Sequence, residues 1–201
     1  FANKNIQLLC IGNLGSSYAY WLFLTWLPYY FIKIRHLSLS QMGIATSASF
    51  VMAVLAVMLG GIASDHLIKL KINPTKSRLV PIVFGCVVAS VSMLILPSLE
   101  NIFAIVGLIS MTIFSLGLRI SPTWALVADI SPASMVGTVG GIQNFANFIG
   151  GGLAPLVTGL ILSMTNNNFT IVFIVGSLIC ACGTIAYLFI NEKNNPVEII
   201  K

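Results

Sequence analysis

Long apolar stretches with almost no charge are the feature that most limits what this chain can fold into. The six stretches are residues 8–32, 42–64, 79–97, 101–127, 135–164 and 169–190. About 20 consecutive apolar residues let a helix cross the hydrocarbon core of a bilayer. Barrel strands are about half that length and alternate in polarity, so these continuous runs do not fit a barrel. The sequence predicts an all-α integral membrane protein with six transmembrane helices.

The rest of the chain is too short for a soluble domain. Only 7% of its residues are charged and 57% are hydrophobic, with a mean hydropathy of +0.98, whereas a soluble domain carries about 25% charged residues. We expect one six-helix bundle over residues 1–190 and a polar cytoplasmic tail over residues 191–201. No signal peptide is visible at Phe1, and the chain is interpreted as a fragment of a longer protein.

The basic residues predict the orientation of the bundle. The formal charge is +5, but most basic residues lie between apolar runs, where they orient helices, and nucleic-acid binding is not expected. With six spans, one side would carry Lys4, Lys69, Lys71, Lys76, Arg78, Lys193 and Lys201, and the other Lys33 and Arg35. Cytoplasmic loops are enriched in Lys and Arg, so both termini are predicted to be cytoplasmic.

The sequence contains no pattern typical of an enzyme or a metal site. Its four cysteines, Cys10, Cys86, Cys180 and Cys182, lie inside apolar runs without the spacing of a zinc site. No nucleophile, base and orienting group are suggested by spacing. We therefore expect no catalytic residue, metal or cofactor.

The run at 135–164 has a stripe of small residues along one helical face. With 100° per residue, the stripe consists of Gly137, Gly141, Asn144, Phe148, Gly151, Pro155 and Gly159. Small residues let membrane helices approach closely, so the stripe predicts a packing face. Gln143 and Asn147 lie on an adjacent face. These amides either bond across helices or form the wall of a polar cavity.

The run at 101–127 is interrupted in a way that suggests a binding site. Arg119, Ser121, Pro122, Thr123 and Trp124 lie within about one and a half turns. Proline removes a backbone donor, which a membrane helix tolerates where protein or a water-filled cavity satisfies the freed groups. A buried cation is costly in lipid, so Arg119 is a candidate partner for an anionic ligand. The alternatives are that it extends to the interface or pairs with an acid outside this sequence.

Polar residues at the ends of the runs are interpreted as helix caps. Ser40 would cap the second helix, and Asp129, followed by Ser131 and Pro132, would cap the fifth. The acids Asp65 and Asp129 lie at span ends rather than inside spans. A proton-coupling carboxylate is therefore not visible in this sequence.

Several segments resemble the major facilitator superfamily, and within it the anion:cation symporters of sugar acids and hexuronates. They are TWLPYYF (residues 25–31), GGIASDHLIK (60–69), SPTWALVADISP (121–132) and GTVGGIQNFANFIGGGLAPLVTG (137–159). The resemblance implies helices seven to twelve, the C-terminal six-helix bundle of a fold whose N-terminal bundle is absent here.

The resemblance also implies functional residues. Family substrate contacts would fall on Ser121, Thr123, Trp124 and Asn144, with Arg119, Gln143 and Asn147 as possible additional cavity residues. The spacing of Gly61 and Asp65 is similar to the superfamily's cytoplasmic gating motif, in which the acid interacts with a neighbouring helix N-terminus. His66 and Ile68 depart from that motif.

The implied activity is transport of a small organic anion, such as a sugar acid, with protons by alternating access. The expected partners are the solute, protons, the bilayer and the missing N-terminal half, and the expected location is a bacterial inner membrane. The main carboxylate-binding cation and the proton-coupling acids of the family would lie in that missing half. Two alternatives remain: a different solute (phosphate, an aromatic carboxylate or a zwitterion), or a truncated membrane module that does not transport.

Overall fold

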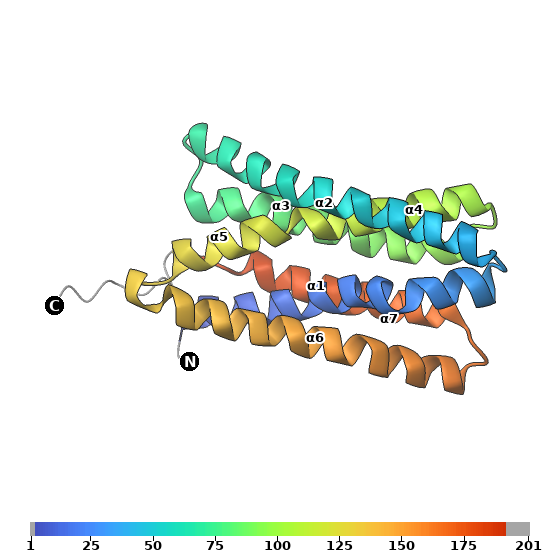
Figure 1. Cartoon of the computed structure of the whole chain (residues 1–201). Coiled ribbons are helices and arrows are strands. Elements are labelled where there is room, and N and C mark those ends of the chain that lie inside the picture. The colour runs from blue at the N-terminus through green and yellow to red at the C-terminus, as the bar shows by residue number, and fades with distance from the viewer. Residues whose placement is uncertain (1–2, 192–201) are drawn as a thin grey trace.

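Helices joined by short turns make up the computed structural model, which describes residues 3–191 (Figure 1). The elements are α1 (Lys4–Tyr29), the π-helical turn η1 (Tyr30–Ile34), α2 (Leu39–Lys69), α3 (Pro74–Ile95), η2 (Leu96–Ser98), α4 (Ile102–Leu118), α5 (Ile120–Ile130), η3 (Ala133–Met135), α6 (Val136–Met164) and α7 (Phe169–Leu188). The predicted all-α class is confirmed for these residues. The predicted tail at 191–201 lies outside them except for Asn191.

Five helical segments within residues 3–191 are long and apolar enough to cross a membrane. They are Leu39–Lys69, Pro74–Ser98, Ile102–Ile130, Ala133–Met164 and Phe169–Leu188. α1 has 26 residues, but it is not among the five, and its buried residues include the polar Asn5, Asn13, Ser16 and Ser17. The five segments make the chain a multi-pass integral membrane protein.

Uncharged side chains begin most of the helices. At α2, the Ser38 hydroxyl accepts from the backbone N–H of Gln41 at 3.3 Å, and the Gln41 amide oxygen accepts from the Ser38 N–H at 3.0 Å. This reciprocal capping box satisfies two donors at the helix start. The predicted cap at Ser40 is therefore wrong by two residues. Asparagine side chains cap α1, α3, α4 and α7, at Asn3, Asn73, Asn101 and Asn168.

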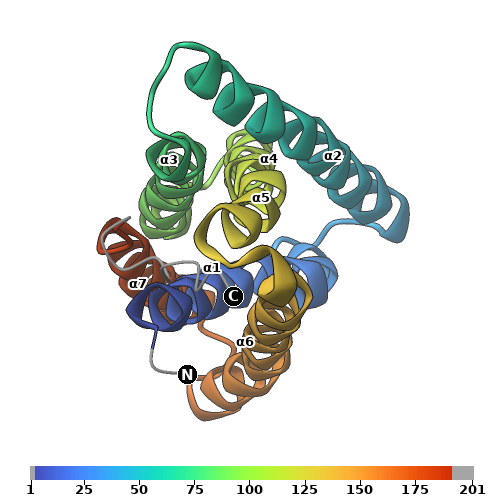
Figure 2. The same ribbon diagram turned by 90° about the vertical axis from the view of Figure 1, so that its left-hand side faces the viewer.

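The bundle brings its first and last helices together. α1 packs between α6 and α7. α3 packs against both α7 and α4, and α2 packs against α4. In the end-on view of Figure 2, α1 and α5 lie near the centre, with α2 and α6 on opposite sides. The Asn5 amide donates to the Asn191 carbonyl at 2.7 Å and accepts from the Asn191 N–H at 3.1 Å. α1 therefore begins where α7 ends.

Glycines allow the closest helix contacts. A Cβ added at Gly15 of α1 would lie 3.0 Å from the Gly183 Cα of α7, and one added at Gly150 of α6 would lie 2.5 Å from the Leu14 carbonyl oxygen of α1. Water does not drive helices together inside a bilayer, so membrane bundles depend on such close packing. α1 is held on two sides in this way.

The packing face of α6 differs from the predicted stripe. Gly140 and Gly150 are buried, whereas a Cβ at Gly137 or Gly141 would meet nothing within 4 Å. The predicted packing face is wrong at Gly137 and Gly141. Farther along the stripe, Gly151 and Gly159 face the Trp21 and Trp26 side chains of α1, at 3.0 and 3.6 Å from an added Cβ. Helical periodicity identified a face of small residues, but much of it is open in this bundle.

Candidate functional site

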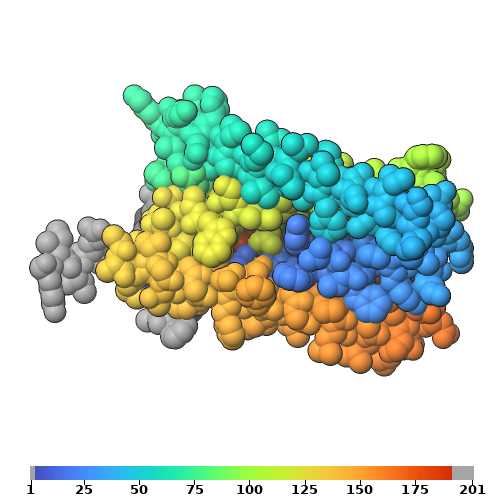
Figure 3. All heavy atoms as spheres, in the orientation of Figure 1, coloured from blue at the N-terminus to red at the C-terminus, as the bar shows by residue number. Residues whose placement is uncertain are grey.

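A polar cavity opens between α1, α5 and α6. It has a volume of about 210 Å³ and is lined by Asn13, Tyr20, Trp21, Arg119, Ile120, Thr123, Trp124, Gln143, Asn144 and Asn147. Figure 3 shows a hollow between α5, in yellow, and α1, in blue. Amides, aromatic rings and one cation thus converge in a bundle whose remaining surface is largely apolar.

The break between α4 and α5 puts a cation into this cavity. α4 ends at Leu118 and α5 begins at Ile120, with Arg119 between them. The Arg119 carbonyl accepts both the Thr123 N–H at 2.9 Å and the Thr123 hydroxyl at 2.6 Å. Pro122 has no N–H to donate, so the Leu118 carbonyl four residues earlier loses its usual helical donor at the break.

The Arg119 guanidinium is buried and bound only to neutral oxygens. The side chain is 4% exposed. Nη1 donates to Asn13 Oδ1 at 2.8 Å, and Nη2 donates to Ser17 Oγ at 3.0 Å. Within residues 3–191 its Nε has no acceptor, and no carboxylate lies within 4.0 Å of the guanidinium. A buried charge without a counter-charge is unfavourable, which marks this position as a candidate binding site.

Two hydrogen bonds connect the partners of Arg119 to α6. The Asn13 amide donates to the Gln143 carbonyl at 2.9 Å, and the Ser17 hydroxyl donates to Asn147 Oδ1 at 2.6 Å. Asn147 therefore both bonds across helices and lines the cavity. The Gln143 side-chain oxygen is buried without a partner among the described residues. The sequence left open whether the α6 amides bond across helices or form a cavity wall, and Asn147 does both.

Most of the sequence-predicted site residues lie around this cavity. Thr123, Trp124 and Asn144 line it, together with the additional candidates Arg119, Gln143 and Asn147. Trp124 is 50% exposed. Ser121 is not among the lining residues, and its hydroxyl lies 2.8 Å from the position that a Cβ would take at Gly61 of α2. Ser121 thus faces α2, while the roles of all these residues remain predictions.

Sequence reasoning missed the contribution of α1. Asn13, Tyr20 and Trp21 line the cavity, and Ser17 supports Arg119. Their spacings of four, seven and eight residues put all four on one face of a helix. A polar and aromatic face in a long apolar run was a usable signal.

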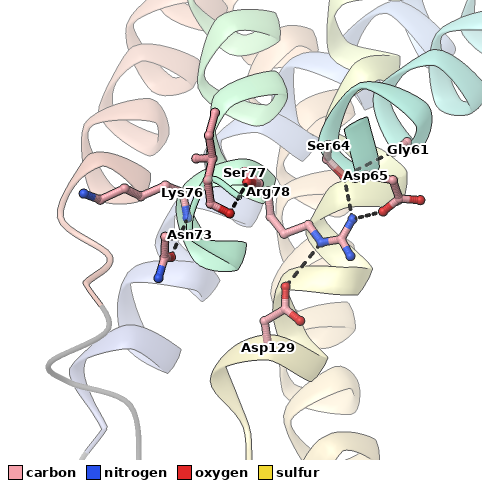
Figure 4. A network of polar contacts seen from close by, with 9 residues as sticks. Gly61, Ser64, Asp65, Asn73, Lys76, Ser77, Arg78 and Asp129 are labelled. Carbon is pink, nitrogen blue, oxygen red and sulfur yellow. Dashed lines mark hydrogen bonds and ion pairs between the residues drawn. The ribbon is translucent and has the colours of Figure 1, made fainter. Parts of the chain in front are cut away.

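A charged cluster lies at the end of the bundle where α2 meets α3 (Figure 4). The Arg78 guanidinium of α3 contacts the Asp65 carboxylate, donates to Ser64 Oγ at 2.6 Å and donates to Asp129 Oδ2 at 3.2 Å. Asp129 lies in α5 and does not cap α6, so that prediction is wrong. Asp65 is paired with a side chain of the neighbouring helix, and Arg78 joins α2, α3 and α5.

The sequence is similar to known membrane transport proteins. Residues 9–199 match the family model described as Major Facilitator Superfamily. A probable L-galactonate transporter from Escherichia coli K12 is 31% identical over 198 residues, which are 98% of this chain and 44% of that protein. A probable galactarate/D-glucarate transporter from the same strain is 30% identical over 201 residues, which are 100% of this chain and 44% of that protein.

A solved structure shows the same fold. A bacterial homologue of the human drug peptide transporters superposes with a TM-score of 0.77 at 18% identity, covering 96% of this chain and 43% of that chain. The chain thus spans less than half the length of the relatives that it matches. These relatives are transporters and not enzymes, as expected from the sequence.

Proposed function

The chain belongs to the major facilitator superfamily, and on this premise we propose that it is the C-terminal six-helix half of a transporter for small organic anions such as sugar acids. The cavity between α1, α5 and α6 is the observation that carries the proposal. Transporters of this superfamily hold their substrates between two halves near the bilayer midplane. The matching relatives have names that refer to galactonate, galactarate and glucarate.

In the proposed topology α1 also crosses the membrane, as the first of six spans, and the five long apolar segments follow it. Its polar residues Asn13 and Ser17 are covered by Arg119 and by α6, so they are not exposed to lipid. Both termini of the chain would be cytoplasmic in a bacterial inner membrane, because the start of α1, which carries Lys4, and the basic α2–α3 connection from Lys69 to Arg78 lie at the same end of the bundle (Figure 1). Lys193 and Lys201, which also entered this prediction, lie outside the described residues.

The lining residues suit a hydroxylated anion. The amide of Asn144 would bond hydroxyl or carboxylate oxygens, and the Trp124 indole would form an apolar wall with one donor. The Thr123 hydroxyl donates its proton to the Arg119 carbonyl, so it would accept a hydrogen bond from a substrate hydroxyl. Ser121 would reach the substrate only in a conformation that turns it away from Gly61. The second half would supply the opposite wall and the proton-coupling carboxylate.

The contacts of Arg78 support a gating role for Gly61 and Asp65. They hold the ends of α2, α3 and α5 together on the proposed cytoplasmic side. Such charge pairs at helix ends stabilise one state of an alternating-access cycle when they form in that state only. Asp65→Asn should then change the transport rate more than the apparent substrate affinity.

The direct test is uptake of labelled L-galactonate and galactarate by proteoliposomes that contain the full-length protein, with and without an inward proton gradient. Gradient-dependent uptake is the expected result. Uptake of phosphate, an aromatic carboxylate or a zwitterion instead would identify a different solute. Folded protein that transports none of these would favour a module without transport activity.

Asn144→Ala provides a residue-level test. It should reduce uptake without lowering the amount of protein in the membrane, because it removes a cavity amide and leaves the buried face of α6 unchanged. Ser163→Ala is the matched control on the same helix, since the Ser163 hydroxyl is exposed and bonds only its own helix at the Leu160 carbonyl. Equal uptake kinetics for the two variants would remove Asn144 from the site.

A further inference from the structure

The positive charge of Arg119 is not neutralised by the described part of the chain. Only three acidic residues fall within residues 3–191, and none of them faces the cavity. Asp65 and Asp129 bind Arg78, and Glu100 is exposed in the connection before α4. An arginine has five N–H donors, and two bonds from Arg119 to neutral oxygens are present. The guanidinium therefore retains both charge and donor capacity.

The two oxygens that bind Arg119 are themselves fixed in orientation. The Asn13 amide NH₂ donates to the Gln143 carbonyl, which directs its oxygen towards the guanidinium. The Ser17 hydroxyl proton goes to Asn147, which leaves the Ser17 oxygen free to accept from Arg119. Supporting hydrogen bonds of this kind hold a functional side chain in one geometry. This support comes from α1 and α6, on either side of the cavity.

We propose that Arg119 selects anionic over neutral ligands in this cavity, and that Asn13 and Ser17 are the residues that position its guanidinium. The inference rests on the proposed transport function and adds the basis of its charge selectivity. A carboxylate forms hydrogen bonds with a guanidinium that are about twice as strong as neutral ones. It would also supply the missing counter-charge. A ligand with the same hydroxyl groups but no carboxylate would leave the buried charge uncompensated.

The experiment compares two probes that differ at one carbon atom only, which is a carboxylate in L-galactonate and a CH₂OH group in the neutral polyol galactitol. Uptake of labelled galactonate, and its inhibition by unlabelled galactonate or galactitol, are measured with the full-length transporter in proteoliposomes. Arg119→Gln should raise the KM for galactonate about 10- to 100-fold, the range expected when a charged hydrogen bond is lost. We expect galactitol to inhibit the native protein only weakly, and the ratio of its inhibitory concentration to that of galactonate should fall in this variant. Arg119→Lys, which keeps the charge, should retain part of the preference.

Asn13→Asp tests the charge without removing Arg119. The new carboxylate would pair with Nη1 and neutralise the guanidinium, so the KM for galactonate should rise as it does in Arg119→Gln. Asn13→Asp keeps an oxygen for Nη1 but loses the NH₂ group that donates to the Gln143 backbone carbonyl at 2.9 Å. Asn13→Leu, which removes the same donor without adding a charge, is therefore its matched control. A KM for galactonate that rises no more in Asn13→Asp than in Asn13→Leu would contradict the charge role of Arg119.

Ser17→Ala and Ser16→Ala form a matched pair for the positioning role. Both serines are buried in α1, but the Ser16 hydroxyl bonds the Gly12 carbonyl of its own helix at 2.7 Å, whereas Ser17 binds Arg119. Ser17→Ala should raise the KM about 3- to 10-fold with little change in kcat, since one hydrogen bond is lost. Ser16→Ala should change the KM less than 2-fold. Equal effects of the two substitutions would overturn the positioning role.

The possible failures can be distinguished. If the native protein transports galactonate but Arg119→Gln and Asn13→Asp keep its KM and its preference over galactitol within 2-fold, the selectivity proposal is overturned and the transport function remains. If the folded native protein transports neither galactonate nor galactarate, the sugar-acid function and the inference that rests on it both fail. Gel filtration of each variant establishes that loss of uptake does not reflect unfolding.

Discussion

Replacing Gly150 with alanine should weaken the contact between α1 and α6. The added methyl group would lie 2.5 Å from the Leu14 carbonyl oxygen, whereas an ordinary contact needs at least 3.4 Å. The obstacle is backbone rather than a flexible side chain, so the two helices must move apart. The cavity lies along the same pair of helices, and separating them would also loosen the bonds from Asn13 and Ser17 to α6.

The size of the effect follows from two opposing contributions. Forcing an extra methyl group into a packed interface costs about 1–3 kcal/mol. Alanine is favoured over glycine in a helix by about 0.5–1 kcal/mol, so we expect a net destabilisation of about 0.5–2 kcal/mol for Gly150→Ala. For a chain of this length, 1 kcal/mol corresponds to about 2–4 °C in Tm. The thermal midpoint should therefore fall by several degrees.

The assay is thermal unfolding of the purified chain in detergent, with Gly141→Ala as the control. Gly141 lies on the same helix and has nothing within 4 Å of an added Cβ, so its alanine variant should be as stable as the native chain or slightly more stable. A Gly150→Ala variant that melts at or above the native temperature would refute the close contact. In the full-length transporter, Gly141→Leu should destabilise the protein only if this open face packs against the second half.

Three further substitutions test other contacts. Arg78→Lys should lower Tm and increase exchange of the amides near Asp129, because a single ammonium group cannot replace the guanidinium contacts with two carboxylates; unchanged exchange would argue against the cluster. Gly183→Ala should cost about 1–3 kcal/mol through the contact with α1, whereas Gly107→Ala, in open space, should not lower Tm; similar melting of the two would contradict the α1–α7 packing. Ser38→Ala should cost about 1 kcal/mol and speed hydrogen exchange at the start of α2, and native exchange there would show that the capping box is dispensable.

Hydrophobicity and local breaks in it made much of the architecture predictable. The apolar runs predicted helices because backbone N–H and C=O groups in lipid must form hydrogen bonds within the protein. Arg119 and the nearby proline marked the break between α4 and α5 because such residues need compensation inside a membrane. Thr123, Trp124 and Asn144 were placed at the cavity from their resemblance to family motifs, and the structure brings them together.

Other features of the fold and the site depend on contacts between residues that are far apart in the sequence, and local sequence patterns do not predict these contacts. Asp129 fits a helix cap by its neighbours in sequence, but its partner is Arg78, 51 residues away. The small residues around Gly141 fit a packing face, yet which side of α6 is covered depends on where α1 lies. The polar face of α1 indicated that Asn13 is not lipid-facing, but its partner Arg119 lies 106 residues away and could not be identified from the sequence around Asn13.

The pairing of α1 with the later helices has a consequence for biogenesis. Asn13 and Ser17 make bonds to residues of α6 that lie 130 positions farther along the chain. At a synthesis rate of about 5–20 residues per second, the most polar helix emerges roughly 6–26 s before these partners exist. During that interval its amide and hydroxyl face lipid, the translocon or a chaperone. Within this bundle, α1 is therefore synthesised before the helix that supplies partners for its polar side chains.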